Sequence, residues 1–499
     1  MKKLFKEHDL LKTILILLVV IVLMTWFIPY GEFGSSAVFS EGEVTPIGIA
    51  HLFYGLIYSM NNYAVQIAFI LLIGMFYGVA VKTEGYKALV AKISKAFKGK
   101  EIPFALAVSF VITVLASILN NTYILLFFMP FIISVLRRIG LDKISSFAIT
   151  FGSILVGILG ATYGTEGFVG FLEWVINGGG TDLTMSTMIV VRAGVLLLAY
   201  ILFSFFNLIY IKKILAKKDE KGKNEVKVID DAFAVEEPKK KNTKTWLTGL
   251  VLIVLFIFAI LGFITWNATA SGTEVFGIEI FDDFHEWLMS LTIGSNEVAI
   301  FERILGGPFA YYDYQLVPAF GNWYLFTYAI VIIIAMIIMA IVSKMKFSEF
   351  FENMGSGALK VIKPIAYLVL AYTAFIFLYW VTLTPTLINE IGSLANGFNP
   401  FILTIQAIVS SIFNLDFAYI GYSLSTYLGS FTGAELNLGV VIFSTIYGLI
   451  QFVTPISMFL VFGLTYMNIP YKKWLKYIWK FFVGMLVCLL VIFTLLAYL

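Results

Sequence analysis

Two pairs of polar clusters interrupt apolar stretches of the chain where a membrane helix would otherwise continue. The first pair comprises Asn120, Asn121 and Thr122, followed by Thr162, Thr165 and Glu166. The second pair comprises Asn414 and Asp416, followed by Thr454 and Ser457. Helices broken at membrane depth leave free N–H groups that bind anions, and free carbonyls that coordinate Na⁺ together with Asn and Thr side chains. We therefore predict that these ten residues form one site for a small polar solute and its coupling ion.

The two carboxyl groups are the strongest candidates. An ionisable residue at membrane depth is costly and by default functional, which favours binding roles for Glu166 and Asp416. The alternative is that both lie closer to the membrane surface. Single hydroxyls are weaker signals, because Ser and Thr in helices often bond only to the preceding turn. Arg192, a few residues into an apolar run, is expected to extend to the outer interface and anchor its helix there.

The composition indicates that lipid is the solvent. The 499 residues are 60% hydrophobic and 17% aromatic, with only 13% charged and a net charge of +3. A soluble domain carries about 25% charged residues, and apolar runs of about 20 residues can cross a hydrocarbon core of about 30 Å. The sequence therefore predicts an all-α polytopic membrane protein.

The lysines indicate the topology. They cluster between polar segments 30–62, 176–186, 267–320 and 389–436, which contain no lysine. Positive charge is retained on the cytoplasmic side during insertion, so these four segments are expected outside. Nine crossings follow, at 11–29, 63–82, 144–177, 187–210, 246–266, 321–343, 364–382, 437–468 and 478–498. We predict a multi-pass protein of the plasma membrane with its N-terminus in the cytoplasm and its C-terminus outside.

Two further apolar stretches do not fit single crossings. Residues 102–136 have basic residues on both flanks, and two full crossings would leave arms of only about 16 residues, each rising 1.5 Å per residue. Residues 400–431 have no basic flank. We predict two re-entrant hairpins, the first opening to the cytoplasm and the second to the outside.

Each predicted hairpin precedes an overlong, interrupted span and then an ordinary one. This order occurs twice with opposite membrane orientation, which is the inverted-repeat plan of many secondary transporters. We predict an N-terminal repeat (1–210), a solvated connecting linker (211–245), a linking span with an extracellular segment (246–320) and a C-terminal inverted repeat (321–499).

Several segments resemble a known family. TWFIPYGEF, GMFYGVAVKTEGYKALVAKISKAFKGKE, VTPIS and NIPYKKWLKY occur in this order along nearly the whole chain, and together they resemble the YfcC family of the ion transporter superfamily. The resemblance implies an elevator-type homodimer with scaffold and transport domains, coupled to Na⁺ or H⁺ or exchanging solutes. Members are described as C4-dicarboxylate carriers or as basic amino acid antiporters. Relatives carry a glutamate pair where this chain has Tyr123 and Ile124.

The sequence leaves two substrate classes open. Two intramembrane carboxylates without a deep lysine or arginine favour an amino acid, and a basic one such as arginine or ornithine would fit. The alternative is a C4-dicarboxylate held by helix N-termini, amides and hydroxyls, with Na⁺ near Asn121 and Thr454 offsetting its charge. An ion channel would not need inverted halves with broken helices.

No catalytic chemistry is expected. His8, His51 and His285 lie in polar flanks, away from the hydroxyls near Asn121 and Thr162 and without ligands at metal-binding spacing. We therefore predict no enzyme, no structural metal, no cofactor beyond a coupling ion of Na⁺ or H⁺, and no nucleic-acid partner. The expected partners are the solute, membrane lipid and a second copy of the chain.

Overall fold

A computed structural model describes residues 9–34, 37–162, 164, 168, 170–220, 232–239, 245–270, 273–294, 298–305, 316–395, 397–415 and 417–498. Nine of the described helices are long and apolar enough to cross a membrane, or ten if the bent pair α3–α4 counts as one span. In the same described residues, the strands form three two-stranded ribbons. The chain is therefore an all-α polytopic membrane protein.

The N-terminal half begins with helices and a short ribbon: α2 (Asp9–Phe27), β1 (Gly31–Phe33), β2 (Phe39–Glu41), α3 (Ile49–Asn62), α4 (Ala64–Ala80) and α5 (Glu84–Ala96). It continues with α6 (Glu101–Ile118), the 3₁₀ helix η2 (Thr122–Phe128) and α7 (Met129–Ile139). The remaining elements are α8 (Lys143–Phe147), the π-helix η3 (Ala148–Gly152), α9 (Ser153–Leu159), α10 (Gly170–Asn177) and α11 (Met185–Glu220).

The next part contains α12 (Thr245–Phe263), β3 (Asn267–Ala270), β4 (Thr273–Gly277), α13 (Ile280–Ser290), β5 (Thr292–Ile293), β6 (Val298–Ala299) and α14 (Ile300–Ile304). It is followed by α15 (Leu325–Val342), α16 (Phe347–Leu359), α17 (Ile362–Val381) and α18 (Leu383–Gly392). The chain ends with α19 (Pro400–Phe413), α20 (Phe417–Gly429), α21 (Gly433–Ile450), α22 (Met458–Tyr466) and α23 (Tyr471–Tyr498).

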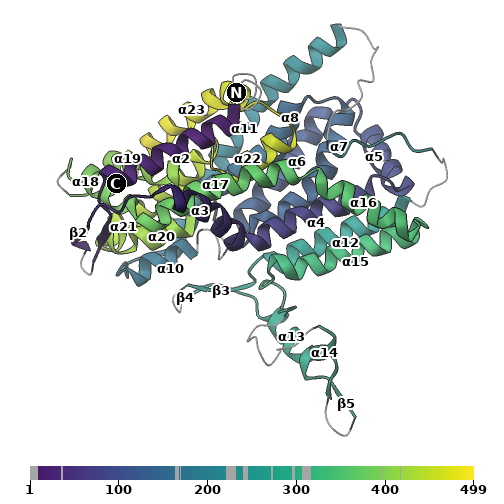
Figure 1. Cartoon of the computed structure of the whole chain (residues 1–499), viewed down its shortest axis with the longest axis horizontal. Helices are drawn as coiled ribbons and strands as arrows, with labels where there is room; N and C mark the ends of the chain where they lie inside the picture. The colour runs from purple at the N-terminus through teal and green to yellow at the C-terminus, as the bar shows by residue number, and fades with distance from the viewer. Residues whose placement is uncertain are drawn as a thin grey trace.

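The bundle has two edges and one protrusion. In Figure 1, one edge is formed by α12, α15 and α16, which lie beside α4. The opposite edge is formed by α2 and α23, and α13, α14 and β5 extend away from the helices. Helices α9, α11, α19 and α21 pack together between these edges and contact α23. This central group contains the interrupted helices.

Each half contains the same succession of elements. A pair of helices joined at a short tip (α6 with η2–α7, and α19 with α20) precedes a helix that breaks and resumes (α8–α9 with α10, and α21 with α22). One long helix then follows, α11 or α23. The first arm of each pair packs against the first part of the broken helix, α6 on α9 and α19 on α21.

Two elements differ from the expected lengths. The arms of the first pair, 101–118 and 122–139, have 18 residues each and are long enough to cross a membrane, where about 16 were expected. The linker predicted to begin at residue 211 starts later, because α11 continues to Glu220. Residues 232–239 of that linker pack on the bundle and are not merely a solvated connection.

The two broken helices cross at a glycine. Gly448 of α21 lies against Leu159, the last residue of α9, and a Cβ at Gly448 would overlap the Cα of Leu159. The absence of a side chain therefore lets the two backbones approach directly beside the first break. This close crossing places the interruption in one half against the interrupted helix of the other half.

Candidate functional site

The first tip (residues 119–121) joins α6 to η2 and is fixed by both asparagines. Asn121 caps η2, because its Oδ1 accepts a 3.1 Å hydrogen bond from the N–H of Tyr123. Asn120 donates its backbone N–H to Phe263 O (2.8 Å) and its Nδ2 to Gly321 O (3.1 Å). The tip is thereby tied to the end of α12 and to the segment before α15.

The first break lies between α9 and α10, and its described residues 161, 162 and 164 include those that contact this tip. Thr162 donates its N–H (3.0 Å) and its hydroxyl (3.3 Å) to the carbonyl of Ser117, in the last turn of α6. Gly164 has φ +119°, and a Cβ there would lie 2.8 Å from Leu119 O, so a glycine is required. Two predicted site residues of this break, Thr165 and Glu166, lie outside the residues that the structure describes.

The second tip (residues 414–416) is held from α21. Asn414 is completely buried, and its Nδ2 donates to Ser410 O at 2.6 Å. The hydroxyl of Tyr447 donates to Leu415 O at 2.7 Å, and Nε2 of Gln451 lies 3.5 Å from Asn414 O. Asp416, also predicted for the site, is outside the described part of the chain.

The second break (residues 451–457) lies against its own tip, as the first does. The Thr454 hydroxyl donates to Ile412 O at 2.8 Å, near the end of α19. Ser457 precedes the first residue of α22 and is 1% exposed. In both breaks, therefore, a threonine hydroxyl donates to a carbonyl in the last turn of the first hairpin arm of the same half.

Aromatic contacts connect the two halves. The ring of Tyr123, beside the first tip, lies 5.8 Å from that of Phe459, just after the second break. Conversely, Phe171 of α10, after the first break, stacks on Phe417 of α20, beside the second tip, with ring centroids 4.5 Å apart and an interplanar angle of 15°. Together with the crossing at Gly448, these contacts join both tips and both breaks into one connected region, which contains the described members of the predicted set. Thr122 lies there as the first, half-buried residue of η2.

Carbonyls freed at the breaks receive donors from the long helix that follows. In the first half, Arg192 of α11 donates to Leu159 O (3.3 Å) and to Ala161 O. In the second half, two residues of α23 have this role: Trp474 Nε1 donates to Phe452 O at 2.9 Å, and the Tyr471 hydroxyl donates to Val453 O. The donor is thus charged in one half and neutral in the other.

Arg192 does not extend to the outer interface, and the anchoring role expected for it is wrong. Its side chain is completely buried. Besides the two carbonyls it donates to Thr445 Oγ1 (3.0 Å) and Ser444 Oγ on α21, and it lies over the Phe168 ring at 4.6 Å. Sequence reasoning had one signal for this, an ionisable residue within an apolar run. The guanidinium of Arg192 stays inside the bundle because the freed carbonyls and the two hydroxyls of α21 offer it several fixed acceptors.

Three buried oxygens in this region have no hydrogen-bond partner among the described residues: Asn120 Oδ1, Asn414 Oδ1 and Ser457 Oγ. All three belong to the predicted set, and they come from the first tip, the second tip and the second break. Side-chain oxygens of this kind are suitable ligands for a small hard cation.

Comparison with known proteins gives two findings. The chain matches the family model described as "C4-dicarboxylate anaerobic carrier" (DcuC) over residues 8–498. It is also similar to the YdaH transporter of Alcanivorax borkumensis, with 12% identity, 97% coverage of both chains and a TM-score of 0.41. The comparison with curated proteins finds no match. The expected likeness to a carrier family is confirmed by the DcuC match, which does not identify the YfcC family specifically.

Arg192 can be tested for its role in holding the broken helices. Arg192→Met would leave the Leu159 and Ala161 carbonyls without this donor, and each unpaired buried group costs about 1–3 kcal/mol. We expect a melting temperature in detergent several degrees below wild type, with Arg192→Lys in between because a lysine lacks the planar fork of donors. The control is Lys212→Met, an exposed position on the same helix. Identical melting of Arg192→Met and wild type would contradict this role.

Proposed function

The chain belongs to the C4-dicarboxylate anaerobic carrier family, and from this we propose that it is a secondary active transporter that carries a C4-dicarboxylate across the cell membrane. The observation that carries the proposal is the family match over residues 8–498. A carrier of this kind is not an enzyme. Coupling to Na⁺ or H⁺ would supply the driving force.

Arg192 removes the main argument for an amino acid substrate. That argument depended on two intramembrane carboxylates with no deep lysine or arginine to neutralise them. A guanidinium buried among both broken helices supplies such a positive charge. Its donors are directed to protein acceptors, so we propose that it acts on a bound anion through its field and by positioning the breaks, and not by direct contact.

The dicarboxylate would be held mainly by neutral groups. Candidates are the N–H groups at the start of α22, since helix N-termini favour negative charge, together with the hydroxyl of Thr122. The unpartnered oxygens of Asn414 and Ser457 fit a Na⁺ ion in the second half, and that of Asn120 fits one in the first. These positions lie beside the predicted Na⁺ sites at Thr454 and Asn121.

The repeated succession of elements supports alternating access by an elevator mechanism. Each half brings its own tip and break to the shared region, as expected for inverted repeats around one substrate site. We further propose a homodimer in the plasma membrane, with the N-terminus in the cytoplasm and the C-terminus outside. The lysine distribution supports this orientation.

Uptake into proteoliposomes tests the substrate. Vesicles preloaded with unlabelled solute are offered labelled succinate, arginine or a neutral amino acid, with and without external Na⁺ or an imposed proton gradient. We expect saturable succinate uptake that requires one of the two ions. Saturable uptake of an amino acid that is stimulated by internal amino acid, without succinate uptake, would contradict the proposal.

Two substitutions test the site itself. Asn121→Ala removes the residue that caps η2 at the first tip, and Asp416→Asn removes the carboxylate that follows Leu415 in the sequence. Each should lower the initial rate of succinate uptake at least tenfold without lowering the yield of folded protein, because the change falls where solute and ion would bind. Ser430→Ala, an exposed position just after α20, is the control. Wild-type rates in both variants would contradict the site assignment.

A further inference from the structure

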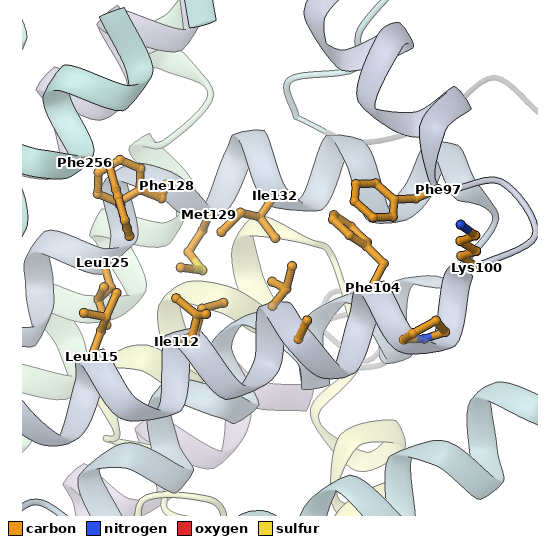
Figure 2. Close-up of a pocket in the computed structure, with 14 residues that line it drawn as sticks. Phe97, Lys100, Phe104, Ile112, Leu115, Leu125, Phe128, Met129, Ile132 and Phe256 are labelled. Atoms are coloured by element: carbon orange, nitrogen blue, oxygen red, sulfur yellow. The ribbon is translucent and has the colours of Figure 1, made fainter. Parts of the chain in front are cut away.

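A cavity of about 450 Å³ lies between the two arms of the first hairpin. Side chains of α6 line one wall, among them Phe104 and Ile112, and Met129 and Ile132 of α7 line the other (Figure 2). Phe256 of α12 and Phe128 lie together near one end of the cavity. With one exception its lining is apolar.

The exception is Lys100, at the opposite end beside the rings of Phe97 and Phe104, whose centroids lie 4.3 Å apart (Figure 2). The cavity also opens to the surface of the bundle, since Val111, which lines it, is 46% exposed. The hairpin arms and α12 are all candidate membrane spans. The surroundings of this opening are therefore hydrocarbon and not water.

The chemistry of the walls selects the occupant. A water molecule needs two to four polar partners, which this lining does not provide. An acyl chain finds apolar contacts along the whole cavity, and a cation at one end attracts an anionic headgroup. Basic side chains next to spanning helices on the cytoplasmic side are a known arrangement for anionic lipids, and Lys100 belongs to a lysine cluster predicted on that side.

We propose that this cavity is a binding site for one anionic phospholipid, with an acyl chain between the hairpin arms and its phosphate at Lys100. This goes beyond the transport function. The lipid would keep α6 and α7 apart and thereby support the first tip, which both arms carry.

Native mass spectrometry tests the site on the full-length protein, reconstituted with phosphatidylglycerol and phosphatidylcholine and then extracted. Wild type should retain one phosphatidylglycerol per chain. Val111→Trp, which fills the opening, should lower the retained fraction several-fold. Lys100→Gln should abolish the preference for phosphatidylglycerol over phosphatidylcholine.

Two matched controls accompany these variants. Val19→Trp places the same ring on α2, at a position that is 54% exposed and outside the cavity. Lys92→Gln removes an exposed lysine of α5 that does not line it. Three results would overturn the proposal. These are unchanged lipid retention in both cavity variants, no retained lipid in wild type, or loss of a bound second copy of this protein, and not of lipid, in the cavity variants.

A second, independent observation concerns the linker. Phe233 is 1% exposed, and its ring lies 5.8 Å from that of Tyr77 on α4 and 6.2 Å from that of Tyr466 on α22. The Nζ of Lys360 lies 4.8 Å from the same ring. A single linker side chain thus bridges α4 to the helix that follows the second break.

Ion pairs hold the same segment, residues 232–239, which we call the strap. Lys87 of α5 lies 3.1 Å from Glu236 of the strap and 3.2 Å from Glu84. Burial lowers the pKa of Lys87, but the two carboxylates outweigh burial and leave this pKa above its usual value. Arg138, at the end of α7, pairs with Glu237.

The strap therefore contacts α4, α5, α7 and α22 at once. The hydroxyl of Tyr77 donates to Phe127 O of η2 at 2.7 Å, so the Phe233 contact is also connected to the first hairpin. If transport moves α22 relative to α4, the contacts of Phe233 must break. Resting on the proposed function, we infer that the strap is an autoinhibitory contact that must undock in each transport cycle.

Alkylation of introduced cysteines measures undocking, in a Cys488→Ser background. Val235→Cys, partly buried in the docked strap, should react slowly at rest and several-fold faster during succinate transport. The exposed neighbour Ala234→Cys should react at one rate in both conditions. Glu236→Lys should speed the resting reaction and raise uptake, and adding Lys87→Glu should restore both.

Three results would overturn the strap proposal: equal reactivity at rest and during transport, faster resting alkylation without faster uptake, or slower uptake in Glu236→Lys. The two readouts also separate this proposal from the transport function. If the chain carries no succinate, uptake fails in every variant, while the resting difference between Val235→Cys and Ala234→Cys still reports whether the strap is docked.

Discussion

The constraint on which this structure depends is that backbone polar groups cannot remain unpaired in hydrocarbon. A helix interrupted at membrane depth loses its internal hydrogen bonds, so other parts of the chain must supply the missing partners. Here they come from two sources. Thr162 and Thr454 tie each break to the hairpin arm before it, and Arg192 and Trp474 tie the freed carbonyls to the long helix after it. Each break is therefore tied to the hairpin and to the long helix of its own half, in addition to the contacts between the halves at Gly448 and Arg192.

The two halves satisfy this constraint with different chemistry. Burying a guanidinium is costly unless its donors meet fixed acceptors, and the four acceptors of Arg192 come from both broken helices. In the second half Trp474 and Tyr471 meet the same need without charge. The result is an asymmetric field across a repeated framework. The fixed positive charge lies beside the first break, which is the arrangement that the proposed anionic solute requires, while the second break carries no described charge.

Sequence reasoning succeeded where a single residue type indicates its own environment. Paired amides at Asn120 and Asn121, and the proline in VTPIS, marked interruptions that the structure contains. It failed where the environment is made by distant segments. Nothing local shows that Arg192 meets carbonyls more than thirty residues away, nor that Phe233, in a polar linker, is buried against Tyr77 and Tyr466. The preference for an amino acid substrate assumed that no cation lay deep in the bundle, and the buried Arg192 removes that assumption.

After these partners are counted, the oxygens left over are informative. Asn414 is wholly buried and uses its Nδ2 on Ser410, yet its Oδ1 has no partner among the described residues, and the same holds for Ser457 Oγ. An unmet buried acceptor costs about 1–3 kcal/mol. Asn414 and Ser457 belong to the second half, and Asn120 Oδ1 in the first half is left without a described partner in the same way. Under the proposed coupling to Na⁺, a bound cation would satisfy these oxygens, and the cost of leaving them unpaired would become part of its binding free energy.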